Sequence, residues 1–230
     1  MLAVAFPVGA GIVGGIIAAF KPPDKVVASA VQHFAAGVVL AAVTTEIVPD
    51  MLHGSVVGWM IIGFAAGVAL MLCLAAVETR MESKGAGSVG ILAVVGVDLL
   101  IDGMLIGVSF LAGGKQGKLI TLALTLEILF LGLSVAAVMA RESASRGRII
   151  ASTSILSLLV PVGAAISVVA FKGLPTGPMT LILAFAAAAL LFLVVEELIV
   201  EAHESAEERW WLTAMFFAGF LVIAVIELVA

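Results

Sequence analysis

The sequence predicts an all-α membrane protein in which eight transmembrane helices form two inverted three-helix units around a central pair. Three observations predict this fold class. Apolar residues make up 63% of the 230 residues and charged residues only 12%, whereas soluble domains have about 45–50% and about 25%. The apolar residues fall into runs of about 20, the length that a helix needs to cross the hydrocarbon layer. The first three runs also resemble the last three.

Eight apolar runs, separated by short charged or Pro/Gly-rich breaks, are the predicted helices. In chain order they cover residues 2–20, 28–50, 56–77, 89–112, 119–140, 149–171, 179–200 and 210–229. The breaks that end the first seven lie at 21–25, 53–54, 78–87, 113–118, 141–148, 172–178 and 201–209. Each run is helical because backbone polar groups in lipid must be paired within their own segment. The breaks leave no room for a soluble domain, so residues 1–230 are expected to form one transmembrane domain.

The composition also excludes several classes of protein. A net charge of −5 without a basic run argues against a nucleic-acid partner. The single cysteine, Cys73, excludes a disulfide framework and a cysteine-rich zinc site. The N-terminus lacks the positive stretch of a signal peptide, so the first run should be retained. A membrane enzyme is the weakest alternative, because the runs contain no Ser-His pair and no metalloprotease motif.

The basic residues predict the orientation of the chain. Of the 11 Lys and Arg residues, eight lie in the breaks after odd-numbered runs, and Lys115, Lys118 and Lys172 lie in the others. Since loops rich in Lys and Arg stay in the cytoplasm, the side with eight is predicted to be cytoplasmic. The chain is then a multi-pass protein of the cell membrane, surrounded by lipid, with both termini extracytoplasmic.

An inverted repeat relates the two ends of the sequence. Phe34-Ala-Ala in the second run matches Phe185-Ala-Ala in the seventh, at an offset of 151 positions, and the acids Glu46 and Asp50 match Glu197 and Glu201. Pro-Val-Gly-Ala occurs in the first and sixth runs, and a Trp begins the third and eighth. The matched runs cross the membrane in opposite directions, with the fourth and fifth runs between them. Such repeats are typical of secondary transporters, whose substrate binds near the midplane.

Three acidic residues of the central pair are the predicted metal site. Asp98 and Asp102 are four residues apart, so both project from one face of the fourth helix. At about 1.5 Å per residue, they and Glu127 of the fifth helix lie at similar depths, roughly 13–21 Å from the outer end. Three converging carboxylates could hold a divalent cation, with water completing its shell. Alternatively, these acids are protonated and only hydrogen-bond neighbouring helices.

Acids at the ends of two other helices are candidates for the cation's path. Glu46 and Asp50 lie near the outer end of the second run and are candidates for entry. The candidates for exit lie near the cytoplasmic end of the seventh run and are Glu196, Glu197, Glu201 and His203. Acids at helix ends are, however, often simply solvated. His33 is interpreted as a residue that is satisfied at a helix start, and Glu227 as reaching the interface.

The chain resembles the ZIP (Zrt/Irt-like) family of divalent metal transporters over essentially its whole length. The resembling motifs are Gly103-Met-Leu-Ile-Gly-Val-Ser-Phe110 in the fourth run and Glu196-Glu-Leu-Ile-Val-Glu-Ala-His203 in the seventh. The resemblance implies eight helices in a 3+2+3 arrangement, both termini outside, and a homodimer. It also implies that the cation is a transported substrate and that no cofactor or catalytic residue is needed.

The chain departs from the family at the metal site. Against the family's His-Asn-x-Pro-(Glu/Asp)-Gly motif, Asp98 replaces the His, Leu99 the Asn and Ile101 the Pro. In the fifth run Glu127 replaces a His, and Leu131 stands where a Glu is expected. The helical frame is thus similar, while the nitrogen ligands are missing.

The leading hypothesis is a ZIP-like secondary transporter that moves zinc, manganese or iron toward the cytoplasm. Carboxylate and water ligands suit harder ions such as manganese, although affinity still rises from manganese to zinc. The alternative keeps the ZIP fold but has altered or lost metal transport, with protons or another small solute as the substrate.

Overall fold

The computed structural model describes residues 2–53, 56–83, 87–205 and 209–229, and every regular element among them is helical. Seven helical segments are long and apolar enough to cross a membrane: Lys25–His53, Val57–Met81, Leu92–Ala112, Gly114–Arg141, Arg146–Phe171, Thr176–His203 and Trp210–Val229. An eighth, α1 (Ala5–Phe20), has 16 residues and follows a 3-10 turn, η1 (Leu2–Val4). The prediction of an all-helical chain, with helices long and apolar enough to cross a membrane, is therefore confirmed for the described residues, and the first helix is shorter than expected.

The second and seventh predicted helices each contain a π-helical turn. The second consists of α2 (Lys25–Ala42), the π turn η2 (Val43–Ile47) and α3 (Val48–His53). The seventh consists of α9 (Thr176–Phe192), the π turn η3 (Leu193–Leu198) and α10 (Ile199–Ser205). Pro49 lies shortly after the π turn η2 and has no N–H to donate to the backbone. Within the turn, the Thr45 hydroxyl donates a hydrogen bond of 2.9 Å to the carbonyl oxygen of Ala41.

The remaining spans are α4 (Val57–Ser83), α5 (Gly87–Ala112), α6 (Gly114–Arg141), α7 (Arg146–Ser157), α8 (Leu159–Phe171) and α11 (Trp210–Val229). Helices α7 and α8 form one span that is interrupted at Leu158, because Pro161 cannot donate a hydrogen bond to the carbonyl of Ser157. Helix α6 begins five residues before its predicted start at 119. The helix can extend beyond its apolar run because the long side chains of Lys115 and Lys118 can place their charged groups at the membrane–water interface.

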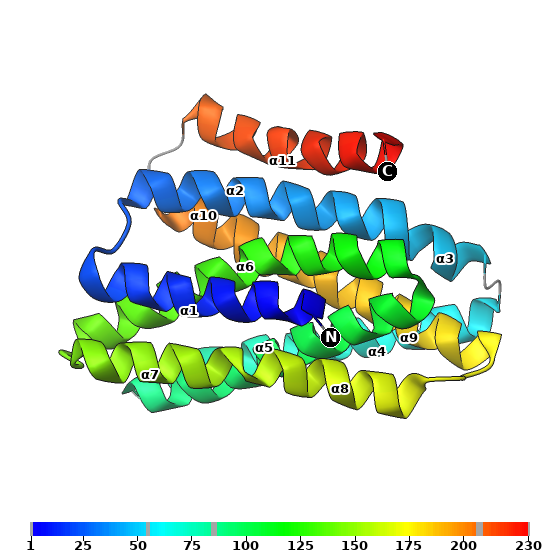
Figure 1. The fold of residues 1–230 in the computed structure, drawn as a ribbon, viewed down its shortest axis with the longest axis horizontal. Helices are drawn as coiled ribbons and strands as arrows, with labels where there is room; N and C mark the ends of the chain where they lie inside the picture. The colour runs from blue at the N-terminus through cyan, green and yellow to red at the C-terminus, as the bar shows by residue number, and fades with distance from the viewer. Residues whose placement is uncertain (1, 54–55, 84–86, 206–208, 230) are drawn as a thin grey trace.

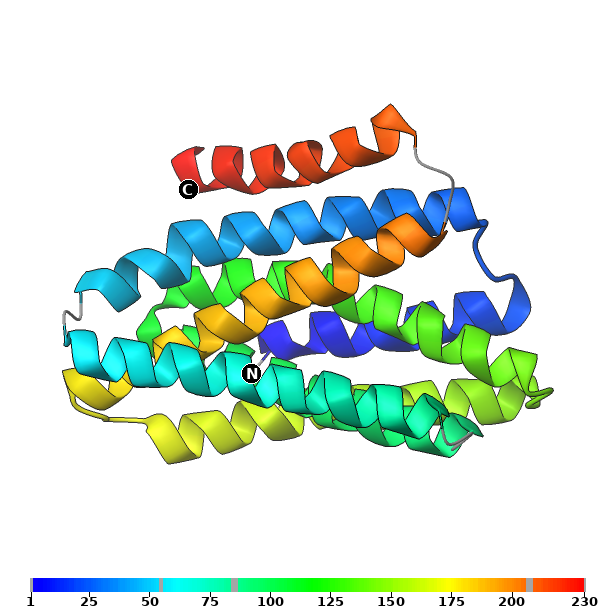
Figure 2. The same ribbon diagram turned by 180° about the vertical axis from the view of Figure 1, so that it is seen from behind.

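The spans run side by side in one bundle, with α11 at its edge against α2 (Figures 1 and 2). The closest helix pairs are α1 with α6, α5 with α8, α2 with α11, and α4 with α9. The spans of α2, α5, α6 and α9 are half or more buried, while α4 and α11 are mostly exposed. The central four spans therefore form the core that surrounds the site.

Two glycines allow α5 and α8 to come into backbone contact. A Cβ on Gly103 of α5 would collide with the carbonyl oxygen of Val160, and a Cβ on Gly163 of α8 with that of Leu100. Small residues allow membrane helices to approach this closely. The contact fixes the position of the part of α5 that carries Asp98 and Asp102.

Helices α1, α4, α6 and α10 all end at the same end of the bundle (Figures 1 and 2). We call this the basic end, because the basic residues there include Lys21, Arg80, Arg141 and Arg209. The other is called the opposite end, where α6 begins with Lys115 and Lys118. Which end faces the cytoplasm remains a prediction from the sequence.

Candidate metal centre

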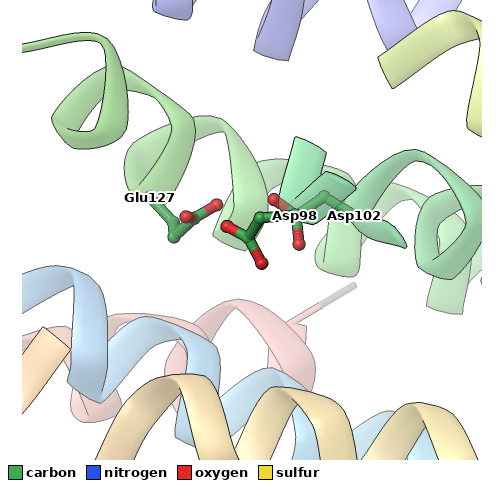
Figure 3. Close-up of side chains that lie close together, drawn as sticks. All are labelled: Asp98, Asp102 and Glu127. Carbon is green, nitrogen blue, oxygen red and sulfur yellow. The ribbon is translucent and has the colours of Figure 1, made fainter. Parts of the chain in front are cut away.

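The carboxyl groups of Asp98, Asp102 and Glu127 lie together between α5 and α6 (Figure 3). One oxygen atom from each lies within 4.8 Å of the others. The side chains of Asp102 and Glu127 are buried, with 1% and 3% of their surface exposed, and Asp98 is partly buried. This spacing suits the binding of one cation by all three groups.

The local structure explains why these carboxyl groups meet. Asp98 and Asp102 lie one helical turn apart on α5, so both point to α6. Helix α6 starts two residues after α5 ends and runs back beside it, which returns Glu127 to the level of Asp102. Ten residues of α5 and thirteen of α6 separate these acids from the turn. At about 1.5 Å per residue the cluster lies roughly 15–20 Å below that end of the bundle.

Asp102 and Glu127 lie close together, with a carboxyl oxygen of each within 4.8 Å of the other. Ionised carboxylates only accept hydrogen bonds, so two such groups, buried side by side, need a proton or a cation between them. Oδ2 of Asp102 and Oε2 of Glu127 are buried and have no hydrogen-bond partner in the described part of the chain. Buried polar atoms of this kind usually have a partner. The pair is thus able to bind either a proton or a cation.

Leu99 and Leu131, at the positions compared above with an Asn and a Glu, line one small cavity with Leu156 and Ser157 of the α7 span. The leucine side chains carry no atom that could bind a metal ion. Among the His, Cys, Asp and Glu residues of the described structure, Asp98, Asp102 and Glu127 are the group that comes together.

The predicted entry residues form a separate polar cluster toward the opposite end. Glu46, on the π turn η2, is 4% exposed and lies close enough to Glu227 of α11 for their charges to interact. Glu227 forms an ion pair of 2.7 Å with Lys115 at the start of α6. Asp50 accepts a hydrogen bond of 3.4 Å from Gln116. The cluster joins α2, α6 and α11 across the end of the bundle.

The predicted exit residues occupy three different surroundings at and near the basic end. Glu196 is exposed. Glu197, on the π turn η3, lies close enough to Glu127 for their charges to repel. Glu201 accepts a hydrogen bond from the buried Gln32 and lines a cavity of about 470 Å³, whose wall includes Phe130, Ser134 and Arg141 of α6. His203 instead lies against His33 of α2, with 5.0 Å between the ring centres.

Four residues of these sites are not predicted as partners from the sequence: Gln32, His33, Lys115 and Glu227. The sequence gives no role to Gln32, places His33 at a helix start, and uses Lys115 only to predict orientation. Glu227, which is expected to reach the interface, is 29% exposed and pairs with Lys115. A polar residue within an apolar run was the available signal for Glu227, whereas its partners are distant in sequence.

A comparison with models of known protein families found no match for the chain. No curated protein matched it by sequence either. The residues of the site are therefore the basis for assigning a function.

Proposed function

We propose that the protein is a secondary transporter that carries divalent metal cations across the membrane toward its basic end. The observation that supports this most strongly is the cluster of Asp98, Asp102 and Glu127 in the buried centre of the bundle. Ionisable residues inside membrane spans are costly and usually mark a substrate pathway. The substrate class is a divalent cation such as zinc, manganese or iron, because the three ligands offer only oxygen.

Binding replaces a proton with a metal ion. The cation takes up oxygens of Asp98, Asp102 and Glu127, so a proton bound between these groups must leave to make room for it. Three ionised carboxylates carry more negative charge than a divalent ion neutralises, which favours a site where a second proton stays bound beside the ion. Since protons compete for the same oxygens, binding weakens at low pH.

A route to the basic end leads along α6. The cavity of about 470 Å³ begins at Phe130, one turn beyond Glu127, and continues to Arg141 between α2, α6 and α10. Glu201 lines this cavity, and Glu197 lies close enough to Glu127 for their charges to repel. Glu46 and Asp50 lie toward the opposite end of the bundle. In the proposed cycle, the Glu46–Glu227–Lys115 cluster closes the opposite end while the basic end is open.

The pairing of helices supports an inverted repeat in a 3+2+3 arrangement. In an inverted repeat, α1 corresponds to the α7–α8 span, α2 to α9, α4 to α11, and α5 to α6. The packing of α1 against α6 then matches the packing of α8 against α5, and the packing of α2 against α11 matches that of α9 against α4. The two π turns occupy matching places, and Glu46 and Glu197 lie on them 151 positions apart. This is the arrangement that membership of the ZIP family implies, and the family's homodimer is part of the same proposal.

A second candidate function keeps the fold but not the metal. The buried oxygens of Asp102 and Glu127 that lack a hydrogen-bond partner among the described residues favour it, because a buried carboxyl pair that binds a proton could itself transfer protons. The two candidates differ in whether a cation displaces that proton.

Uptake into proteoliposomes tests the proposal. We expect Asp98→Asn, Asp102→Asn and Glu127→Gln each to lower the uptake of Mn²⁺ and Zn²⁺ by about tenfold or more, since each removes a charged ligand. Asp24→Asn is the matched control, because Asp24 is exposed at the basic end and makes no side-chain cap. Uptake of both ions that survives all three changes would exclude the site, and proton flux without metal uptake would favour the second candidate.

A further inference from the structure

A second group of potential metal ligands lies at the basic end, on helices other than those of the carboxylate cluster. His33 of α2 and His203 of α10 line a cavity of about 290 Å³ together with Ser29, Arg209, Trp210 and Thr213. His33 is 4% exposed, whereas His203 is exposed. The cavity therefore connects a buried imidazole with one that is open to the surroundings.

Backbone hydrogen bonds determine which nitrogen of each ring is free. The Nδ1 atom of His33 lies 2.9 Å from the carbonyl oxygen of Ser29, and Nδ1 of His203 lies 2.7 Å from that of Ile199. Since a carbonyl oxygen only accepts, both Nδ1 atoms carry the hydrogen, and in a neutral ring Nε2 then keeps its lone pair. Histidines that bind metals are oriented by the same kind of bond.

The buried Nε2 atom of His33 needs a partner. It has no hydrogen-bond partner in the described residues, and leaving a buried acceptor unsatisfied costs about 1–3 kcal/mol. Contact with the His203 ring alone leaves the atom unsatisfied. A metal ion bound to Nε2 would remove the cost.

The separation of the rings fits coordination of one metal ion. A metal about 2.0–2.1 Å from each Nε2, in tetrahedral geometry, would place the two ring centres about 5 Å apart. The observed separation is 5.0 Å, with an angle of 58° between the ring planes. We propose that His33 and His203 form a second, imidazole-based site that binds a transition-metal ion such as zinc or cobalt, with water from the cavity completing its shell.

This site goes beyond the proposed transport and does not depend on it. Its imidazole ligands favour zinc, cobalt, nickel and copper over manganese and magnesium, whereas the carboxylate cluster accepts harder ions. Arg209 lines the same cavity and its positive charge opposes a cation. Arg209→Gln is therefore expected to strengthen metal binding about two- to fivefold, from a repulsion of a fraction of a kcal/mol between exposed groups. An anion site at the same place would instead be weakened by this change.

The test uses the purified full-length protein in detergent, with Zn²⁺ and Co²⁺ as probes. Equilibrium dialysis gives the number of Zn²⁺ ions bound, and the visible absorption of Co²⁺ reports nitrogen coordination. His203→Ala is expected to remove one Zn²⁺ equivalent and the Co²⁺ signal, or to weaken both at least tenfold, and His33→Gln to do the same. His53→Ala is the matched control. Its Nδ1 makes the same kind of bond, 2.7 Å from the carbonyl oxygen of Pro49, but its ring is exposed and contacts no second histidine in the described structure.

The double change Asp102→Asn and Glu127→Gln separates this proposal from the first. It should remove the other Zn²⁺ equivalent and leave the Co²⁺ signal of the histidines intact. His203 is exposed, so His203→Ala keeps the test usable even if His33→Gln does not fold. An unchanged Co²⁺ signal in His203→Ala, or weaker Zn²⁺ binding in Arg209→Gln, would overturn the assignment.

Discussion

At the scale of single residues, the exchange of nitrogen for oxygen ligands decides which metal the central site prefers. Asp98, Asp102 and Glu127 offer carboxylate oxygens within 4.8 Å of one another. We expect Asp98→His to raise the uptake of Zn²⁺ relative to Mn²⁺ by about tenfold, because imidazole favours zinc. Competition between the two ions in proteoliposomes measures the ratio. A ratio that stays constant would mean that Asp98 is not a ligand.

Acidification should reduce binding at the same site. The three carboxyl groups must release protons before they bind a metal, so protonation and binding exclude each other. The apparent affinity for Mn²⁺ is expected to fall by up to tenfold for each unit decrease in pH once one proton must be displaced per ion bound. Isothermal titration at several pH values measures this slope and the protons released. A flat profile with no proton release would contradict the exchange.

The sequence alone predicted the central cluster well, for a simple physical reason. Asp98 and Asp102 share a face through helical periodicity, and Glu127 follows after a tight turn, so local rules suffice. The pairs His33–His203 and Lys115–Glu227 join residues more than 100 positions apart. Their contacts depend on how whole helices pack, which no local pattern encodes. The polar clusters at the two ends of the bundle could therefore not be assembled before the fold was known.

At the scale of the elements, apolar runs predicted which segments are helices but not where the helices change their winding. The break at Leu158 could have been inferred from Pro161, because proline removes one backbone donor. The π turn η3 has no proline, and Val200 stands where Pro49 stands in the matching segment. Turns of this type often occur at functional sites.

The contact between α5 and α8 gives a prediction at this scale. Gly163→Ala should destabilise the protein by about 1–3 kcal/mol, because the added methyl group collides with the carbonyl oxygen of Leu100 and pushes the helices apart. Gly9→Ala is the control. A Cβ at Gly9 meets no atom within 4 Å, so this change should be neutral or slightly stabilising. Thermal unfolding in detergent compares the two, and equal melting temperatures would show that α5 and α8 are not closely packed in solution.

At the scale of the whole molecule, the distribution of basic residues predicts the orientation in the membrane. A cysteine placed at Glu142 should react with an impermeant thiol reagent only from the cytoplasmic side, and one at Lys172 only from outside. Both positions are exposed and lie at different ends of the bundle. The native Cys73 is exposed and must first be changed to Ser. Labelling of the Glu142 position from outside alone would reverse the predicted direction of transport.

Alternating access predicts that the cluster at the opposite end must open during each cycle. Lys115 of α6 and Glu227 of α11 are joined by an ion pair of 2.7 Å, and Glu46 of the α2 span lies near the same carboxylate. We expect a reversible cross-link between cysteines at Lys115 and Glu227, in the Cys73→Ser background, to hold this end closed. Metal uptake should then fall about tenfold or more and return on reduction, since the cation could no longer reach Asp102 from that side. Each single-cysteine variant, treated with the same reagent, controls for the loss of the ion pair itself. Full uptake by the cross-linked protein would mean that α6 and α11 do not separate during transport.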